Sequence, residues 1–172
     1  VPHKCGRSSV GGIHVIRYAY FREVKMTASE WLDRSLNHED PMDSFSSCWI
    51  GFNNLYNNYP SNSERNSISN FVDANVTEGD AEEIINLHDT EIAYFMSQAV
   101  INLRNSERDT QVDINAYNES DSFIAKLKSI LMIAYQVRCN LVHGGKSPSR
   151  ERDVELCRYS WPFVVELVDR YA

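Results

Sequence analysis

Two residues whose side chains can act on a phosphate lie five positions apart in this sequence, at Arg138 and His143. Arginine carries a permanent charge on a planar fork of donors that fits phosphate oxygens. Histidine can give or take a proton near neutral pH. Gln136, Asn140 and His143 are spaced by four and three, which places three polar side chains along one stripe of a helix. The segment therefore contains a candidate site.

The helix that must position these residues has the clearest pattern in the chain. We expect it to run from Asp121 to the glycines Gly144 and Gly145, because glycine readily adopts the left-handed conformation of a helix C-cap. Its core-facing seam steps by four and three through Leu127, Leu131, Ala134, Arg138 and Leu141. On an ideal helix Arg138 and His143 lie about 140° apart around the axis and ~7.5 Å along it. Convergence on one phosphate then requires a frayed helix end, the long reach of arginine, or a second copy of the helix.

Each residue also has a structural interpretation when it is taken alone. A lone arginine on a core-facing seam usually pairs with a carboxylate or reaches the surface along its aliphatic stem. A lone histidine in the last turn of a helix can cap carbonyl groups and interact with the negative end of the helix dipole. A bundle in which Arg138 is a paired core cation and His143 a cap thus remains an alternative.

The rest of the chain predicts further helices and no convincing strand after Val24. Residues 13–24 fit either a short strand or a first helix. The predicted helices, listed by their approximate ranges, are 27–38 after a Thr27 to Glu30 capping box, 41–59 after Pro41, 66–74, 84–103, 121–143 and 149–171, the last with a kink or break at Pro162. The polar stretch 105–120 reads as a loop or insertion. We expect an all-α domain at 27–172, preceded by a segment of uncertain structure at 1–26.

Composition and charge narrow the class of protein. A chain of 172 residues with 42% hydrophobic and 24% charged residues fits one globular domain, and no apolar run is long enough to span a bilayer. The net charge is −7, yet the range 122–158 holds seven basic and three acidic residues, a local +4 that leaves −11 for the remainder. Four dispersed cysteines and the lack of an apolar leader favour free thiols and a cytoplasmic protein.

No cofactor or metal is expected from the sequence. His3, His14, His38 and His88 lack the spacing of a metal-ligand set. The four cysteines show no short Cys-x-x-Cys pair of the kind that holds zinc.

Arg-x-x-x-x-His at the end of a long helix in an all-helical domain is the signature of the HEPN superfamily, which this chain resembles. The segment Tyr135–Lys146 is similar to small bacterial HEPN proteins of the Apea-like type, and the aromatic segment Trp49–Tyr56 is similar to an earlier core helix of those proteins. The likeness covers most of the range 27–171. It implies an HEPN-like bundle of about five or six helices.

The resemblance also implies a metal-independent endoribonuclease whose composite site forms across a homodimer axis. His143 would be the general acid or base that helps the ribose 2′-hydroxyl attack the adjacent phosphate, and Arg138 would clamp that phosphate. Asn140 would orient the scissile group or the imidazole, although many relatives carry a polar residue at the position of Cys139. Lys146, Arg150 and Arg152 would steer RNA toward the site, or else form a solvated helix start.

The resemblance to the HEPN superfamily further suggests toxin–antitoxin activity or antiviral defence, with an antitoxin or other regulatory partner. The superfamily also contains catalytically silent members that bind nucleotides or serve as dimerisation and regulatory modules. Such a module is therefore the main alternative to the ribonuclease. The presence of both Arg138 and His143 favours the enzyme.

Overall fold

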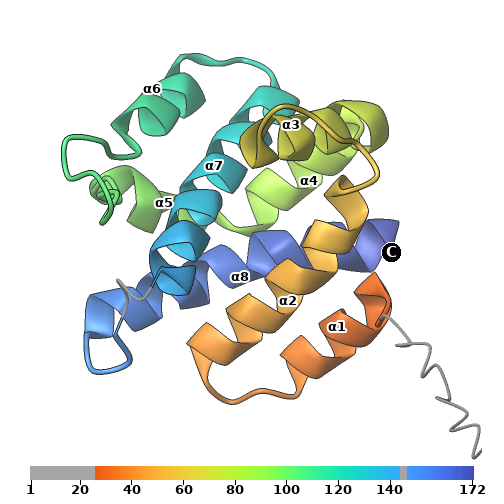
Figure 1. Cartoon of the computed structure of the whole chain (residues 1–172). Coiled ribbons are helices and arrows are strands. Elements are labelled where there is room, and N and C mark those ends of the chain that lie inside the picture. Colours follow the sequence, from red (N-terminus) through yellow and green to blue (C-terminus); the bar gives the residue numbers. More distant parts are fainter. Residues whose placement is uncertain (1–25, 144–146) are drawn as a thin grey trace, which may run out of the picture.

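The computed structural model describes residues 26–143 and 147–172, and within these ranges it contains eight helices (Figure 1). They are α1 (Ala28–Leu36), α2 (Pro41–Tyr56), α3 (Glu64–Asn75), α4 (Glu78–Leu87), α5 (Asp89–Ser97), α6 (Gln111–Glu119), α7 (Phe123–Val142) and α8 (Glu151–Tyr171). The prediction of an all-α fold is confirmed. In the described part of the chain, the only β-type pairing is an isolated bridge between Ile101 and Asp109.

The first helices begin where their capping residues predict. The Thr27 hydroxyl accepts a hydrogen bond from the backbone N–H of Glu30, and the Glu30 carboxylate accepts one from the backbone N–H of Thr27. This reciprocal pair satisfies two amides that have no partner within the helix. At α2 the Asp40 side chain accepts from the amides of Met42 and Asp43, and Pro41 occupies the first helical turn. The capping box and the proline start are both confirmed.

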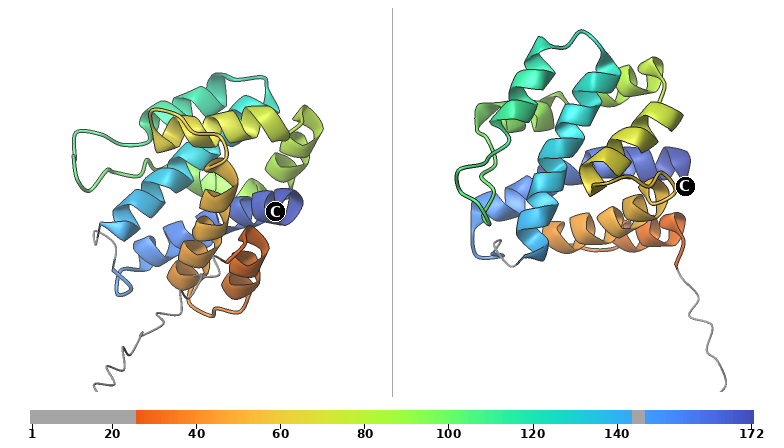
Figure 2. Two further views of the ribbon diagram at one scale, coloured as in Figure 1. Left: turned by 45° about the vertical axis from the view of Figure 1, so that its right-hand side comes forward. Right: turned by 45° about the horizontal axis from the view of Figure 1, so that its top comes forward.

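The helix α7 lies at the centre of the bundle. It packs against α3, α4, α6 and α8, while α1 and α2 form an adjacent pair that covers another part of α8 (Figure 2). Leu127, Ile130, Leu131, Ile133 and Val137 of α7 are completely buried. The C-terminal part of α7, from Tyr135 onward, lines a cleft.

The expected number of five or six helices is wrong. The helix predicted over 84–103 is two helices, because His88 has φ −122° and ψ 40° and ends α4 as it begins α5. The His88 ring packs edge-on against Phe163 and lies near the carboxylates of Glu91 and Glu166. Helical structure then stops at Ser97, so the range 98–103 belongs to a loop.

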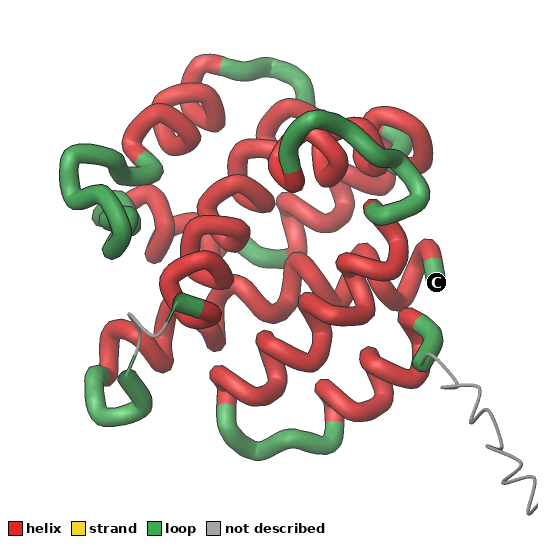
Figure 3. Tube along the Cα trace, viewed as in Figure 1, coloured by secondary structure: helices red, strands yellow, loops and turns green. Residues whose placement is uncertain are grey.

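The prediction of a loop or insertion over 105–120 is also wrong in its second half, where α6 forms. This helix packs against α7, and its Ile114 is buried although Val112 is exposed. The helix carries too few apolar residues to show a helical period in the sequence. The loop that remains, residues 98–110, connects α5 to α6 and is called the 98–110 loop below (Figure 3).

The last helix, α8, continues through Pro162 without a break. Nearby, the Ser160 hydroxyl donates to the carbonyl of Leu156 inside the helix. The expectations for residues 13–24 and for the Gly144–Gly145 cap lie outside the described residues. Among the helices that are described, none has a stretch sufficiently long and apolar to cross a membrane.

Candidate phosphate-binding cleft

Arg138 and His143 line one cleft of about 640 Å³ in a single subunit. Its walls are the C-terminal half of α7, the 98–110 loop and the starts of α3 and α6. The lining includes four arginines and four carboxylates, which are Arg65, Arg104, Arg108, Arg138, Glu64, Glu107, Asp109 and Asp113, together with Tyr135, Cys139 and His143. We call it the α7 cleft. The structure thus places both candidate residues along one cleft although they do not share a stripe of the helix.

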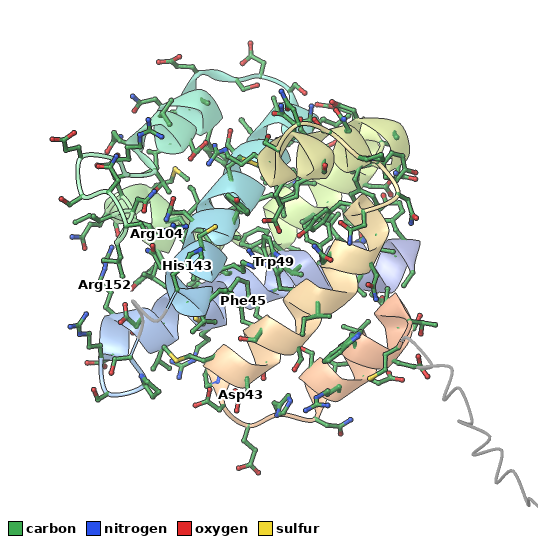
Figure 4. The ribbon with its side chains drawn as sticks, in the orientation of Figure 1. Asp43, Phe45, Trp49, Arg104, His143 and Arg152 are labelled. Atoms are coloured by element: carbon green, nitrogen blue, oxygen red, sulfur yellow. The ribbon has the colours of Figure 1, made fainter. Side chains whose placement is uncertain are left out.

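His143 is the C-cap residue of α7, and its side chain is exposed at the cleft. Its backbone N–H donates to the carbonyl of Cys139 at 3.2 Å. The imidazole Nε2 lies 3.2 Å from Nη1 of Arg104, which comes from the 98–110 loop. Figure 4 shows both side chains on the same side of the last turns of α7. A loop arginine therefore accompanies the imidazole that the sequence singled out.

Arg138 is bonded to a carboxylate of α3. Its Nη1 donates to Oε2 of Glu64 at 3.3 Å, and the Arg138 side chain remains 27% exposed. The other Glu64 oxygen accepts a short hydrogen bond from the hydroxyl of Tyr56, which in turn accepts one from Asn53. The guanidinium is thus partly neutralised inside the subunit while it still lines the cleft.

Asn140 lies behind the 98–110 loop, and its side chain is not among those that line the α7 cleft. It is 2% exposed, and its amide is bonded on both sides. Its Oδ1 accepts from the backbone N–H of Leu103 at 3.0 Å and from Gln136 at 3.0 Å, while its Nδ2 donates to the carbonyl of Ile101 at 2.8 Å. In this arrangement Asn140 orients the loop that carries Arg104, rather than a group in the cleft.

Of the three basic residues predicted to steer RNA, the two that the structure describes, Arg150 and Arg152, do not line the α7 cleft. Lys146 lies outside the described residues. Arg152 donates to the carbonyl of Ala99 at 3.3 Å and makes a short bond to Gln98, so it holds the other end of the 98–110 loop. Arg150 is exposed and lines, with Arg152, a separate pocket of about 220 Å³ that also contains Asn140.

Two further basic residues of the range 122–158, Lys126 and Lys128, also lie away from the α7 cleft. Lys126 lies over the rings of Tyr117 and Phe123, and Lys128 forms an ion pair with Asp73. Fifteen residues at the helical rise put Lys128 roughly 20 Å from His143 along the axis of α7. These lysines therefore add no charge to the cleft.

Two of the four arginines in the cleft are paired with carboxylates. Arg65 Nη2 donates to Oδ1 of Asp113 at 2.8 Å. The guanidinium carbon of Arg65 lies 6.0 Å from the centroid of the Tyr135 ring. Burial raises the pKa of Asp113 above its ordinary value, although Arg65 opposes that shift. Burial, reinforced by a hydrogen bond with Cys139, also raises the pKa of Tyr135. The phenol of Tyr135 therefore stays protonated.

Sequence reasoning missed Glu64, Arg65 and Arg104 as members of this site. Glu64 and Arg65 begin a helix, where an acidic residue is usual, and no spacing connects them to α7. Arg104 lies in a polar stretch without a period. Among residues 26–143 and 147–172, no group of three or more His, Cys, Asp or Glu side chains is arranged to hold a metal ion.

Comparison with known proteins gave no match, whether with family models, curated proteins or solved structures.

Proposed function

We propose that the chain is a metal-independent endoribonuclease of the HEPN type that acts in the α7 cleft. The observation that carries the proposal is that Arg138 and His143 line the same cleft, together with a second arginine, Arg104. An exposed imidazole beside two guanidinium groups is suited to a phosphodiester, because arginine binds phosphate oxygens and imidazole transfers protons. One subunit supplies these three side chains, and the matching residues of a second subunit would complete a composite site across the dimer axis.

In the proposed reaction, His143 removes the proton of a ribose 2′-hydroxyl. The oxygen attacks the adjacent phosphorus, the bond to the 5′-oxygen breaks, and that oxygen takes up a proton from solvent water. The products are a 2′,3′-cyclic phosphate and a free 5′-hydroxyl. Arg138 stabilises the charge that develops on the pentacoordinate phosphate. The phosphate must compete with Glu64 for the Arg138 guanidinium.

A homodimer is part of the proposal, with two copies of the C-terminal end of α7 close to each other. Support comes from exposed apolar side chains beside Arg138, where Ile50 is 42% and Val142 is 61% exposed. With Trp49 and Leu141 they line a pocket of about 220 Å³ that Arg138 also lines. These side chains could contribute to a contact between two subunits. Toxin–antitoxin activity or antiviral defence within the cell, with a regulatory partner, would suit such an enzyme.

The test is incubation of the purified protein with mixed RNA in excess EDTA, with analysis of the product ends and of the oligomeric state by light scattering. We expect cleavage that leaves cyclic phosphate ends and is abolished in Arg138→Ala and in His143→Ala. Arg158→Ala removes the same charge from an exposed position on α8 and should cleave normally. Intact RNA in every reaction, with folded protein, would refute the enzyme.

The ion pair between Arg138 and Glu64 favours a second candidate, a catalytically silent module that binds nucleotides or regulates a partner. In such a module Arg138 would chiefly stabilise the bundle through its ion pair with Glu64. A partly buried guanidinium destabilises the fold when it has no partner, so the pair would be kept for stability. Nucleotide binding by isothermal titration calorimetry, together with inert RNA, would select this candidate. Cleavage by the wild type and its loss in His143→Ala would exclude it.

A further inference from the structure

As a hydrogen bond, the contact between Arg104 and His143 fits one form of the imidazole. A guanidinium has only donor N–H groups, so a hydrogen bond from Arg104 Nη1 to Nε2 of His143 at 3.2 Å requires a lone pair on Nε2. A ring that accepts this hydrogen bond is neutral, with its proton on Nδ1. In this form the nitrogen that faces the cleft is the basic one, and Arg104 covers it.

Arg104 differs from two other arginines of the α7 cleft in the partner that it has. Arg65 is bonded to Asp113 and Arg138 to Glu64, both ionisable carboxylates, whereas Arg104 is bonded to an imidazole that is neutral in this contact. A guanidinium binds phosphate oxygens through charge-assisted, often bidentate bonds that are stronger than a bond to a neutral acceptor. An incoming phosphate therefore exchanges a weak partner for a strong one at Arg104, and must displace a carboxylate at Arg65 or Arg138.

The backbone around Arg104 is held in place by a buried residue. Asn140 of α7 bonds the amide of Leu103, which precedes Arg104, and the carbonyl of Ile101. The backbone N–H of Arg104 itself donates to the Asn102 side chain at 2.9 Å. The arginine is exposed, but its main chain is anchored to the same helix that carries His143. This arrangement keeps the guanidinium within reach of the imidazole.

We propose that Arg104 is a phosphate-binding residue of the α7 cleft, which covers His143 Nε2 when the cleft is empty and releases it when a phosphate group binds. That the bound phosphate belongs to RNA rests on the proposed function. That Arg104 binds a phosphate group is independent of the proposed function. Asn140 is a positioning residue that acts through the loop.

The experiment is NMR of ring-¹⁵N-labelled histidine in the full chain, with inorganic phosphate as the probe. In the free wild type we expect the His143 ring to show the neutral form with its proton on Nδ1, and phosphate to shift its Nε2 signal. Arg104→Ala should weaken phosphate binding by about tenfold or more, the loss expected for a charged hydrogen bond. Arg104→Lys should restore part of the affinity, and Arg158→Ala should match the wild type.

Equal phosphate affinity in Arg104→Ala and Arg158→Ala, or a His143 ring that carries its proton on Nε2 in the free protein, would overturn the inference. Circular dichroism of each variant checks that it is folded. The RNA assay separates the two proposals. If the wild type cleaves RNA and Arg104→Ala cleaves equally well, this inference fails and the nuclease stands. If RNA stays intact while phosphate binding depends on Arg104, the nuclease fails and the phosphate site stands.

Discussion

Arg138 on α7 donates to Glu64, the first residue of α3, at 3.3 Å, across 74 positions of sequence. The bond joins the central helix to the edge of the α7 cleft. Glu64 and any anion bound in the cleft therefore compete for the Arg138 guanidinium. How strongly Glu64 holds Arg138 therefore decides between a phosphate clamp and a structural cation.

Replacement of Glu64 by glutamine should increase RNA affinity. Glutamine still accepts from Tyr56 but carries no charge, so Arg138 becomes available to a phosphate, and we expect a gain of up to about fivefold. The pair is partly exposed, so the free energy of unfolding should fall by less than about 1 kcal/mol. Fluorescence anisotropy with a 2′-deoxy oligonucleotide and urea denaturation measure the two quantities.

The matched control for this charge change is Glu39→Gln, an exposed glutamate between α1 and α2 that should leave both quantities unchanged. Unaltered affinity in Glu64→Gln, combined with a loss of stability, would favour the structural role of Arg138.

Replacement of Asn140 by alanine should destabilise the protein and loosen the 98–110 loop. The variant loses bonds to Leu103, Ile101 and Gln136 and leaves two backbone groups without those partners, for which about 2–3 kcal/mol is expected. Urea denaturation measures the stability, and amide hydrogen exchange should rise first in residues 98–110. Asn115→Ala, on an exposed face of α6, should change stability by less than about 0.5 kcal/mol. Unchanged exchange in the loop would contradict the anchoring role.

The two glycines Gly51 and Gly79 should respond to alanine with opposite signs. In most helices this change stabilises, by up to about 1 kcal/mol. At Gly51 the new Cβ would lie 2.9 Å from the carbonyl oxygen of Ala28 and 3.2 Å from Cβ of Trp31, so α1 and α2 must separate and stability should fall. At Gly79 the nearest neighbouring atom is 3.9 Å away, and stability should rise. Thermal unfolding of both variants tests the close approach, which would be disproved by a stabilised Gly51→Ala.

Acid should weaken the N-terminal capping box of α4 through Asp80. Hydrogen bonds from the Thr77 hydroxyl and amide, with smaller contributions from Tyr171 and Arg170, lower the pKa of Asp80 below its ordinary value of 3.8. A carboxyl whose folded pKa is lowered stabilises the protein above its unfolded pKa, and this contribution is lost as the pH falls through the folded value. The wild type should therefore exceed Asp80→Asn in stability at about pH 7, and the difference should shrink near pH 3.

Urea denaturation at the two pH values measures this difference, with Asp121→Asn, an exposed carboxylate between α6 and α7, as the control. A difference that stays constant with pH would show that Asp80 contributes through its shape and not its charge.

The sequence by itself determined the helical class, the capped starts of α1 and α2, and the long helix that ends beside His143. These features depend on residues close in sequence, whose spacing and hydrogen-bonding groups act within one or two turns. The same local signals failed at α6, which has little apolar periodicity, and at His88, where packing against Phe163 accompanies a break in a continuous pattern.

Only the tertiary structure decided what surrounds the candidate residues. Glu64 contacts Arg138, and Arg104 contacts His143, each across a long stretch of chain. Asn140 bonds the 98–110 loop and does not line the cleft. A residue's own position carries no information on such partners, because they depend on how separate helices pack. The sequence pattern therefore indicated the guanidinium of Arg138 and the imidazole of His143. The packing of α3 and the 98–110 loop against α7 determined the neighbours, ion pairs and exposure of these two groups.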